Sequence, residues 1–152
     1  MPVRSGAVVR AGSQGRVANG LEPLLARFGI EFGDRVLVDP EHPMPGAAPL
    51  LAFTLDQGWG AHAVVRPLVG RAMSFVLARE LGLDAAEDGS QPAALISSAE
   101  QSWAESDLVG IRSGEPPRFD AATDPRGPVV LAAAGTLGNA KVVVVASDQF
   151  AL

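Results

Sequence analysis

Short apolar runs, separated by glycine, proline and small polar residues, dominate the pattern of this chain. Several of them lack the apolar–polar alternation of a strand with one face in water, so they predict strands that are buried on both faces. In chain order, we expect strands at residues 7–10, 35–39, 49–55, 62–68, 72–79, 93–97, 129–131 and 142–145. The periodicity of residues 72–79 also permits a helix. Strands therefore outnumber helices in the prediction.

The clearest helix signal lies between Asn19 and Phe28. Asn19 is a favoured N-cap residue, and Gly29 stands where a left-handed C-cap is expected. Apolar residues recur at helical spacing in this segment. They predict one buried face, made of Leu21, Leu24, Leu25 and Phe28.

The remainder of the chain predicts little further helix. Ser98 and Gln101 have the spacing of a capping box, which indicates one or two helical turns directly after the strand at 93–97. After Asp148 we expect the first turn of another helix. Polar or proline-rich stretches are expected to be loops, at residues 1–18, 84–92 and 107–124.

Residues 128–147 are long enough and apolar enough to suggest a membrane span. Their only charge is Lys141, but Gly135, Gly138 and Asn139 lie in the middle, between two β-branched runs. This arrangement favours two buried strands joined by a Gly-Asn turn over a transmembrane helix. We therefore expect no membrane span in this chain.

Composition and charge narrow the possible partners. The 152 residues fit a single domain with its own core. With 12 basic and 17 acidic residues the net charge is −5. A nucleic-acid partner is not expected, because such binding needs clustered Lys and Arg. The chain has no cysteine, which excludes thiol nucleophiles, disulfides and Cys-ligated zinc.

Neither a cofactor nor a metal site is expected from the sequence. The glycines at 12 and 15 lack the spacing of a phosphate-binding loop and do not join a strand to a helix. The two histidines, His42 and His62, lie in separate segments. Neither has an acidic or histidine neighbour at metal-ligand spacing, so each is expected to be a loop or strand-edge side chain.

Ser98 is the one candidate nucleophile, because it follows a strand and precedes an expected helix. His62 and Asp148 could complete a catalytic triad with it. However, the sequence around Ser98 lacks the Gly-x-Ser-x-Gly turn that exposes such a nucleophile. A simple helix cap is the alternative interpretation of this serine.

Polar residues at strand ends are candidates for a ligand site, since open α/β sheets place their functional groups there. The same residue types also form turns and caps. Trp103 has two interpretations as well: it covers the edge of a sheet in the core, or it is an exposed contact for a partner. The candidate ligand or partner surface consists of Asp39, Ser98, Trp103, Ser147 and Asp148.

Four segments resemble those of a known family when taken in order. They are GLEPLLARFGI with RVLVDP at 20–40, AHAVVRPLVGRAMSFVLARELGL at 61–83, LISSAEQSWAESDL at 95–108 and GPVVLAAAGTLGNAKVVVVASDQFAL at 127–152. Together they resemble the soluble extracytoplasmic domain of gliding-motility-type auxiliary proteins of ABC-2-type transport systems. The chain departs from the family at His62-Ala63, where the family has His-Pro, and at Gln149, which is an insertion.

The resemblance implies an α/β fold with a mostly parallel sheet flanked by helices. This would be a flavodoxin-like or class I glutamine-amidotransferase-like sandwich, rich in strands and lacking its first strand. Residues 19–152 would form the α/β core, and residues 1–18 a loop or truncated edge. The resemblance also implies an extracytoplasmic domain cut from a longer, membrane-anchored protein, with permease and ATPase subunits as partners.

Three functions are therefore open as hypotheses. The first is a non-catalytic auxiliary or binding domain of an ABC-type export or motility system, as the resemblance implies. The second is a serine-dependent hydrolase or transferase that uses Ser98 with His62. The third is a small-ligand-binding domain that uses the strand-end groups Asp39, Ser98 and Asp148.

Overall fold

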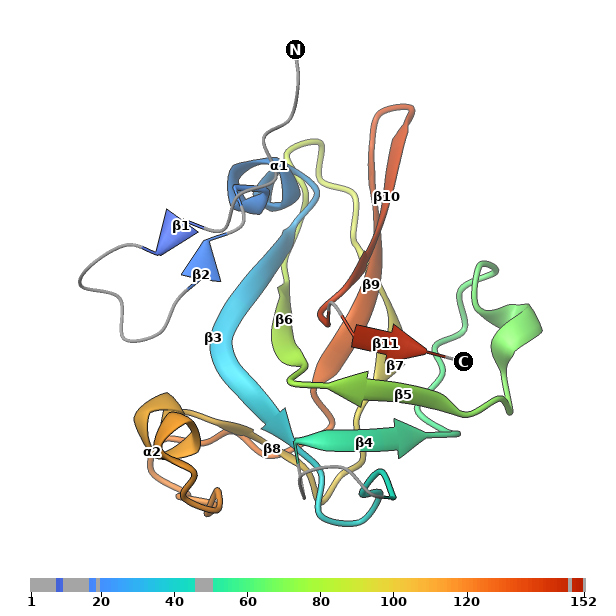
Figure 1. Ribbon diagram of the computed structural model, residues 1–152. Coiled ribbons are helices and arrows are strands. Elements are labelled where there is room, and N and C mark those ends of the chain that lie inside the picture. The colour runs from blue at the N-terminus through green and yellow to red at the C-terminus, as the bar shows by residue number, and fades with distance from the viewer. Residues whose placement is uncertain (1–7, 10–16, 19, 46–50, 148, 152) are drawn as a thin grey trace.

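Antiparallel strands form most of the structure. The computed structural model describes residues 8–9, 17–18, 20–45, 51–147 and 149–151. Within these residues the strands form three sheets of three strands each, together with a two-stranded ribbon of β1 (Val8–Val9) and β2 (Val17–Ala18). All of these pairings are antiparallel (Figure 1).

The first sheet is centred on the nine-residue strand β3 (Ile30–Val38), which lies between β6 (Arg79–Leu83) and β8 (Trp103–Glu105). β6 pairs with residues along β3 from its start, whereas β8 pairs only with its last three residues. The register shifts between Phe32 and Val36, and β3 curves visibly along its length (Figure 1). A register shift of this kind bends a strand.

The second sheet has β9 (Val130–Leu137) between β10 (Ala140–Val145) and β7 (Ala93–Ser97). β9 and β10 form a hairpin in which Leu137 pairs with Ala140. Its turn is Gly138-Asn139, with Gly138 at φ 58°, the positive φ that a tight two-residue hairpin turn requires. The predicted strand pair with a Gly-Asn turn is confirmed, but the prediction that both strands are buried is wrong for β10, in which Val144 is the one buried residue.

The third sheet has β5 (Met73–Val76) between β4 (Ala52–Leu55) and β11 (Gln149–Ala151). Only Leu77 and Ala78 separate β5 from β6, and Leu77 has a positive φ of 49°. Backbone hydrogen bonds join the sheets at this bend: Leu37 N–H donates to the Ala78 carbonyl, and Arg79 N–H to the Ala146 carbonyl. The three sheets are therefore connected parts of one body.

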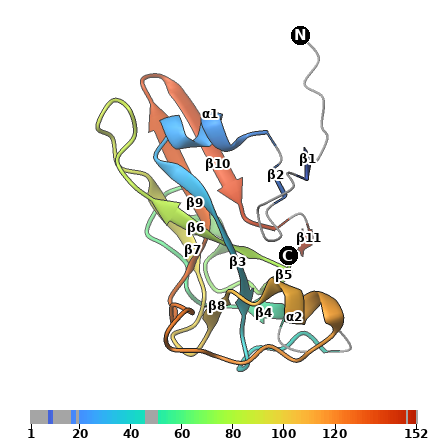
Figure 2. The same ribbon diagram turned by 90° about the vertical axis from the view of Figure 1, so that its left-hand side faces the viewer.

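The helices are short. They are α1 (Glu22–Arg27), α2 (Leu108–Ser113) and the 3-10 turn η1 (Arg66–Leu68), which lies in the connection between β4 and β5. Figures 1 and 2 show α1 beside the start of β3 and α2 near its end. No helix in the described part of the chain is long and apolar enough to cross a bilayer.

The core is divided into two clusters of buried side chains. The larger one lies among the strands and includes Phe53 and Phe75, whose stacked rings have centroids 5.6 Å apart. The smaller one lies beneath α1 and contains Leu25, Phe28 and Ile30. Phe28 packs directly against β9, since a Cβ on Gly135 would stand 3.0 Å from the Phe28 Cβ.

The expected α/β fold is wrong. The structure has no mostly parallel sheet and no flavodoxin-like or amidotransferase-like sandwich among its described residues. Parallel neighbours need a crossover of a dozen or more residues, usually a helix, and the two α-helices here have six residues each. Apolar runs without alternation also occur in antiparallel strands that lie between core clusters, so the hydrophobic pattern did not distinguish the two architectures.

The helix predicted from Asn19 is shorter and differently oriented. α1 begins at Glu22 with Leu21 in the N-cap position, and Asn19 lies outside the described residues. Leu25 and Phe28 are buried, but Leu21 and Leu24 are 43% and 48% exposed. The predicted apolar face is therefore only half buried.

Three other local predictions are wrong. Residues 62–68 form a loop and the turn η1 instead of a strand, and residues 98–101 form a turn without a helix. The chain end forms β11 instead of a helical turn. Conversely, α2 occurs in the predicted loop at 107–124. The Asp107 side chain caps α2 by accepting from Gly110 N–H at 2.9 Å, and Gly114 ends it at φ 85°.

Candidate functional site

A buried carboxylate stands at the end of β3. Asp39 has no solvent exposure, yet no basic residue lies within ion-pair distance of it except His42 among the described residues. Its Oδ1 accepts the backbone N–H groups of Glu41 at 3.0 Å and His42 at 3.1 Å. These bonds fold the Asp-Pro-Glu-His sequence into a tight turn, which explains why an Asp is favoured here.

The same carboxylate also holds the ring of His42. The ring Nδ1 lies 3.1 Å from both Oδ1 and Oδ2 of Asp39. Because a carboxylate only accepts, Nδ1 must carry a proton, and in the neutral ring the lone pair is then on Nε2. Nε2 lies 3.4 Å from the amide nitrogen of Gln57. His42 is thus oriented by a buried acid and presents an acceptor toward Gln57.

The neighbouring strand fixes His42 relative to Gln57. Thr54 N–H donates to the His42 carbonyl at 3.0 Å, and Met44 N–H donates to the Ala52 carbonyl at 2.8 Å. The segment after the Asp39 turn therefore runs beside β4, and Gln57 follows β4 by two residues. Both partners are positioned by backbone hydrogen bonds and not only by their side chains.

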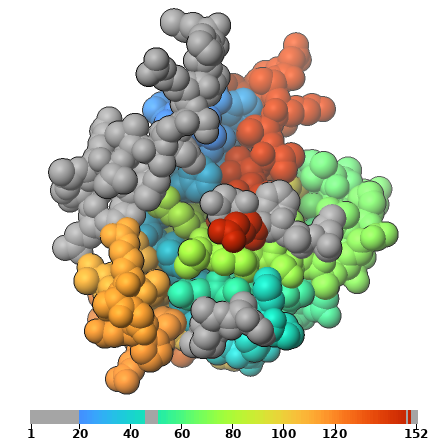
Figure 3. Space-filling model, viewed as in Figure 1, coloured from blue at the N-terminus to red at the C-terminus, as the bar shows by residue number. Residues whose placement is uncertain are grey.

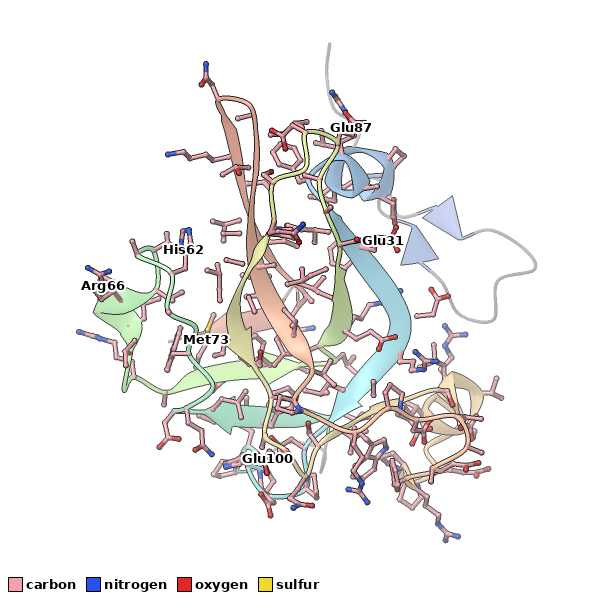
Figure 4. The ribbon with its side chains drawn as sticks, turned by 180° about the vertical axis from the view of Figure 1, so that it is seen from behind. Glu31, His62, Arg66, Met73, Glu87 and Glu100 are labelled. Atoms are coloured by element: carbon pink, nitrogen blue, oxygen red, sulfur yellow. The ribbon has the colours of Figure 1, made fainter. Side chains whose placement is uncertain are left out.

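A cleft of about 400 Å³ lies where this region meets the turn after β7; we call it the His42 cleft. Its walls carry two carboxylates and two primary amides but no Lys or Arg. It is lined by Glu41, Gln57, Gly58, Ser98, Ala99, Glu100 and Gln101. In Figure 4, Glu100 marks its position at the lower end of the molecule.

Gly58 is needed for the close approach of two of these walls. It has a φ of +81°, and a Cβ at this position would stand 2.0 Å from the Ser97 carbonyl oxygen. Ser97 N–H in turn donates to the Gly58 carbonyl at 2.9 Å. Any side chain here would separate the segment from the end of β7 and change the shape of the cleft.

Ser98 lines the cleft but is tied into the structure. It is only 4% exposed, and its Oγ accepts from Val129 N–H at 2.8 Å and lies 2.7 Å from the Ser102 Oγ. The Ser102 hydroxyl also lies 2.7 Å from the Ala99 carbonyl oxygen. These bonds join the end of β7 to the start of the β9 segment.

The structure does not bring His62 to Ser98. His62 is exposed on the loop before η1, where its Nδ1 accepts from Val64 N–H at 3.2 Å. Figure 4 shows His62 well away from Glu100, which is two residues from Ser98. The histidine at the margin of the cleft that Ser98 lines is His42, whose ring contacts the lining residue Gln57. Its signal in the sequence was the Asp three residues before it, the spacing at which an Asp side chain meets its own turn.

The other candidate residues have structural surroundings. Trp103 is 7% exposed, packs edge-on against Phe119 and donates from Nε1 to Glu105 Oε2 at 3.1 Å. The Ser147 hydroxyl donates to the Val76 carbonyl at 2.8 Å, which joins the end of β10 to β5. Asp148 lies outside the described residues.

A second cleft, of about 310 Å³, borders α2. It is lined by Glu105, Asp107, Gly110, Ile111, Glu115, Pro116, Pro117 and Arg118. Both carboxylate oxygens of the buried Glu105 are occupied, one by the Trp103 indole and the other by Asp107 N–H at 2.9 Å. Two acids of this cleft, Glu105 and Asp107, therefore have structural roles.

Asp124 anchors the loop that follows α2. It accepts from the Ser106 hydroxyl at 2.7 Å, from Ser106 N–H at 3.1 Å and from Asp120 N–H at 2.9 Å. Burial raises the pKa of Asp124, but the hydrogen bonds from Ser106 and Asp120 outweigh that effect and hold the pKa below its usual range. The carboxylate therefore contributes to stability in its charged form.

Metal ligation finds no support in the described region, because no three His, Asp or Glu side chains there are grouped so that they could hold an ion. The His42 cleft therefore offers hydrogen-bond acceptors instead of a metal centre.

The chain was compared with families, proteins and structures that are already known. No protein-family model, no curated protein and no solved structure matches it. Its function must therefore be argued from the His42 cleft itself.

Proposed function

We propose that this protein is a binding domain that takes a small polar ligand in the His42 cleft. The observation that carries the proposal is the fully buried Asp39 carboxylate, which fixes the His42 ring beside Gln57 at the margin of a 400 Å³ cleft. Small-molecule sites typically combine a cleft of this size with a few oriented polar groups.

The lining residues favour a neutral or cationic ligand that is rich in hydrogen-bond donors. Glu41 and Glu100 supply carboxylate oxygens, and the amides of Gln57 and Gln101 can accept and donate. The lone pair on His42 Nε2 faces the Gln57 amide and so orients that lining side chain. Sugars, polyols and organic amines have hydroxyl or ammonium groups that match these acceptors, whereas a phosphate would meet two carboxylates and no cation.

Catalysis by Ser98 is less well supported than binding. A serine nucleophile needs a base within hydrogen-bond reach. The partners of the Ser98 hydroxyl are Val129 N–H and the Ser102 hydroxyl, and His62 is bonded within its own loop. The hydrolase or transferase hypothesis therefore draws no support from these contacts.

The transport-auxiliary role stays a prediction. It rested on the family resemblance, and the described residues do not form the α/β fold which that resemblance implied. Permease and ATPase partners and an extracytoplasmic location stay predictions in the same way. A ligand-binding domain would be compatible with such a role, but the His42 cleft does not depend on it.

Thermal denaturation against panels of sugars, polyols, amines, nucleotides and short peptides would test the proposal. A ligand at 100 times its dissociation constant stabilises a protein by about 2.7 kcal/mol, which raises the Tm of a domain of this size by roughly 5–10 °C. We expect hits among the sugars, polyols or amines, and none among the nucleotides.

Matched variants locate the site. Gln57→Ala and Glu100→Gln should each abolish the Tm shift, because both residues line the His42 cleft. Gln149→Ala and Glu115→Gln change an amide and a carboxylate at exposed positions outside the cleft, so these variants should retain the shift. If all five panels gave no stabilisation, or if the shift survived both cleft substitutions, the protein would not bind its ligand here.

A further inference from the structure

An exposed basic lobe stands out on this acidic protein. Between Gln57 and Arg79 the chain contains no Asp or Glu, although its net charge is −5. Within that stretch, residues 61–71 form the loop around η1, which we call the basic lobe. It projects at the right-hand edge of Figures 1 and 3. In Figure 4, Arg66 extends from the lobe near His62.

The lobe exposes apolar side chains together with its cations. Val64 and Val69 are 48% and 58% exposed, and both Arg66 and Arg71 are exposed. Isolated exposed valines are ordinary, but here two of them stand in one short loop with two arginines. This mixture is typical of protein contact surfaces, in which arginine is enriched.

The lobe is held in a defined shape by its own hydrogen bonds and by one anchor in the core. Val65 is 5% exposed and belongs to the larger core cluster. Leu68 N–H donates to the Val65 carbonyl at 2.8 Å, and Arg71 N–H donates to the Leu68 carbonyl at 2.9 Å. A preorganised surface loses less entropy on binding than a disordered one.

The cations of the lobe are unused within the described structure. Arg27, Arg35 and Arg79 each lie in an ion pair, with Glu87, Glu80 and Asp34 respectively. Arg66 and Arg71 have no such partner among the described residues, and their own stretch of chain offers no acid. Their guanidinium groups are therefore available to carboxylates from another molecule.

We propose that the basic lobe docks an acidic segment of a partner protein. Guanidinium groups bind carboxylates in a bidentate geometry, and leucine or a similar side chain of the segment would cover Val64 and Val69. An anionic membrane is disfavoured, since two arginines supply little attraction and the rest of the chain is acidic. Nucleic acid is disfavoured because two phosphate contacts give little affinity at physiological salt.

Fluorescence anisotropy with a labelled twelve-residue peptide of alternating Glu and Leu tests this surface. We expect saturable binding that weakens as NaCl is raised from 50 to 300 mM, and no binding of the matching Ser-Leu peptide. The double variant Arg66→Glu/Arg71→Glu should weaken binding of the Glu-Leu peptide at least about tenfold, since it replaces two attractions by two repulsions.

A matched control separates the lobe from the net charge of the protein. Arg118→Glu/Lys141→Glu makes the same change of four charge units at two exposed cations elsewhere and should alter affinity less than about twofold. Val64→Ser/Val69→Ser should weaken binding about threefold or more, and should do so at high salt as well. Far-UV circular dichroism would check that each variant is folded.

Several outcomes would overturn the proposal. Absence of peptide binding, or equal losses in the two charge variants, would show that the lobe is not the docking surface. Sedimentation with phosphatidylserine vesicles, or a shift with double-stranded DNA, in place of peptide binding would assign the lobe to a membrane or to nucleic acid. None of these results bears on the His42 cleft, whose ligand is tested separately.

Discussion

Replacing Asp39 by Asn should change the chemistry of the His42 cleft while leaving the fold in place. The wild-type carboxylate accepts from Glu41 N–H, His42 N–H and His42 Nδ1–H. In the variant, the amide oxygen can keep both backbone donors, but the new NH₂ group stands near the position of Oδ2, 3.1 Å from Nδ1. Two donors would then face each other. We expect His42 to respond by moving its proton from Nδ1 to Nε2.

The energetic cost follows from the change in acceptor. A hydrogen bond to a charged group contributes about 1.5–3 kcal/mol and a neutral one about 0.5–1.5 kcal/mol, so each hydrogen bond to residue 39 should weaken in the variant. Part of the resulting loss of stability is offset, because the variant no longer buries a charged group. We therefore expect Asp39→Asn to cost about 1–2 kcal/mol. Asp39→Ala, which leaves all three donors without this acceptor, should cost about 2–4 kcal/mol.

Two measurements check this reasoning. Urea unfolding gives the free energies. Nitrogen-15 NMR at about pH 9, used to observe the neutral ring, reports which nitrogen of His42 carries the proton. His62 is the internal control, because its Nδ1 accepts from Val64 N–H and should keep the proton on Nε2 in both proteins.

The functional outcome separates orientation from stability. Asp39→Asn should abolish the ligand-induced Tm shift, since Nε2 would become a donor, even though the variant stays folded. An unchanged His42 tautomer in Asp39→Asn, or full ligand binding with a switched tautomer, would refute the role assigned to this pair.

Three further predictions concern the rest of the molecule. Phe28→Ala should cost about 3–5 kcal/mol because the ring is 6% exposed and packs on β9, whereas Leu24→Ala should cost less than about 0.5 kcal/mol, as urea unfolding would show. Asp124→Asn should destabilise the protein at neutral pH. Because folding lowers the pKa of Asp124, the wild-type protein should be more stable than the variant above the unfolded pKa of this group. This difference in the free energy of unfolding should disappear as the pH falls through the folded pKa. Urea unfolding midpoints between pH 7 and pH 2 would reveal the change. Ser98→Ala should cost about 1–3 kcal/mol by leaving the buried Val129 N–H unpaired, and wild-type protein should not react with a fluorophosphonate probe.

Each of these three expectations has a clear contrary result. Equal losses for the Phe28 and Leu24 substitutions would mean that α1 packs on its other face. A difference between wild type and the Asp124 variant that persisted at low pH would show that its charge is not the cause. Labelling of wild-type protein that disappeared in Ser98→Ala would restore the hydrolase hypothesis.

Local signals in the sequence predicted the elements whose chemistry is local. The strand at 93–97 is β7 with the predicted bounds, and the predicted Gly138-Asn139 turn connects β9 to β10. The pairing of strands was not predictable in the same way. An apolar run is compatible with either strand direction, and direction depends on how the connecting segments pack. The prediction of the buried helix face was wrong for a similar reason. Leu21 and Leu24 have helical spacing, but their side chains are exposed and lie outside both core clusters.

The candidate site was predictable only in part. Asp39 and Ser98 were identified as strand-end groups, and Ser98 does line the His42 cleft. The spacing of His42 does not fit metal ligation, and its function in this site depends instead on Asp39, which accepts its Nδ1–H within a turn. Gln57 carries no local signal. It meets His42 because backbone hydrogen bonds from Thr54 and Met44 place the segment after His42 beside β4. This contact depends on folding and not on neighbouring residues in the sequence.

The bend between β5 and β6 has a consequence for how the molecule unfolds. Leu77 and Ala78 are all that separates a strand of one sheet from a strand of another. Across the same junction the Ser147 hydroxyl donates to the Val76 carbonyl and Arg79 N–H donates to the Ala146 carbonyl. One sheet therefore cannot open without pulling apart the hydrogen bonds of its neighbours. Small domains with such shared boundaries lose their structure in a single cooperative transition. Amide protons in all three sheets should then exchange with a similar maximal protection, and a ligand in the His42 cleft should slow exchange even in strands that it does not touch.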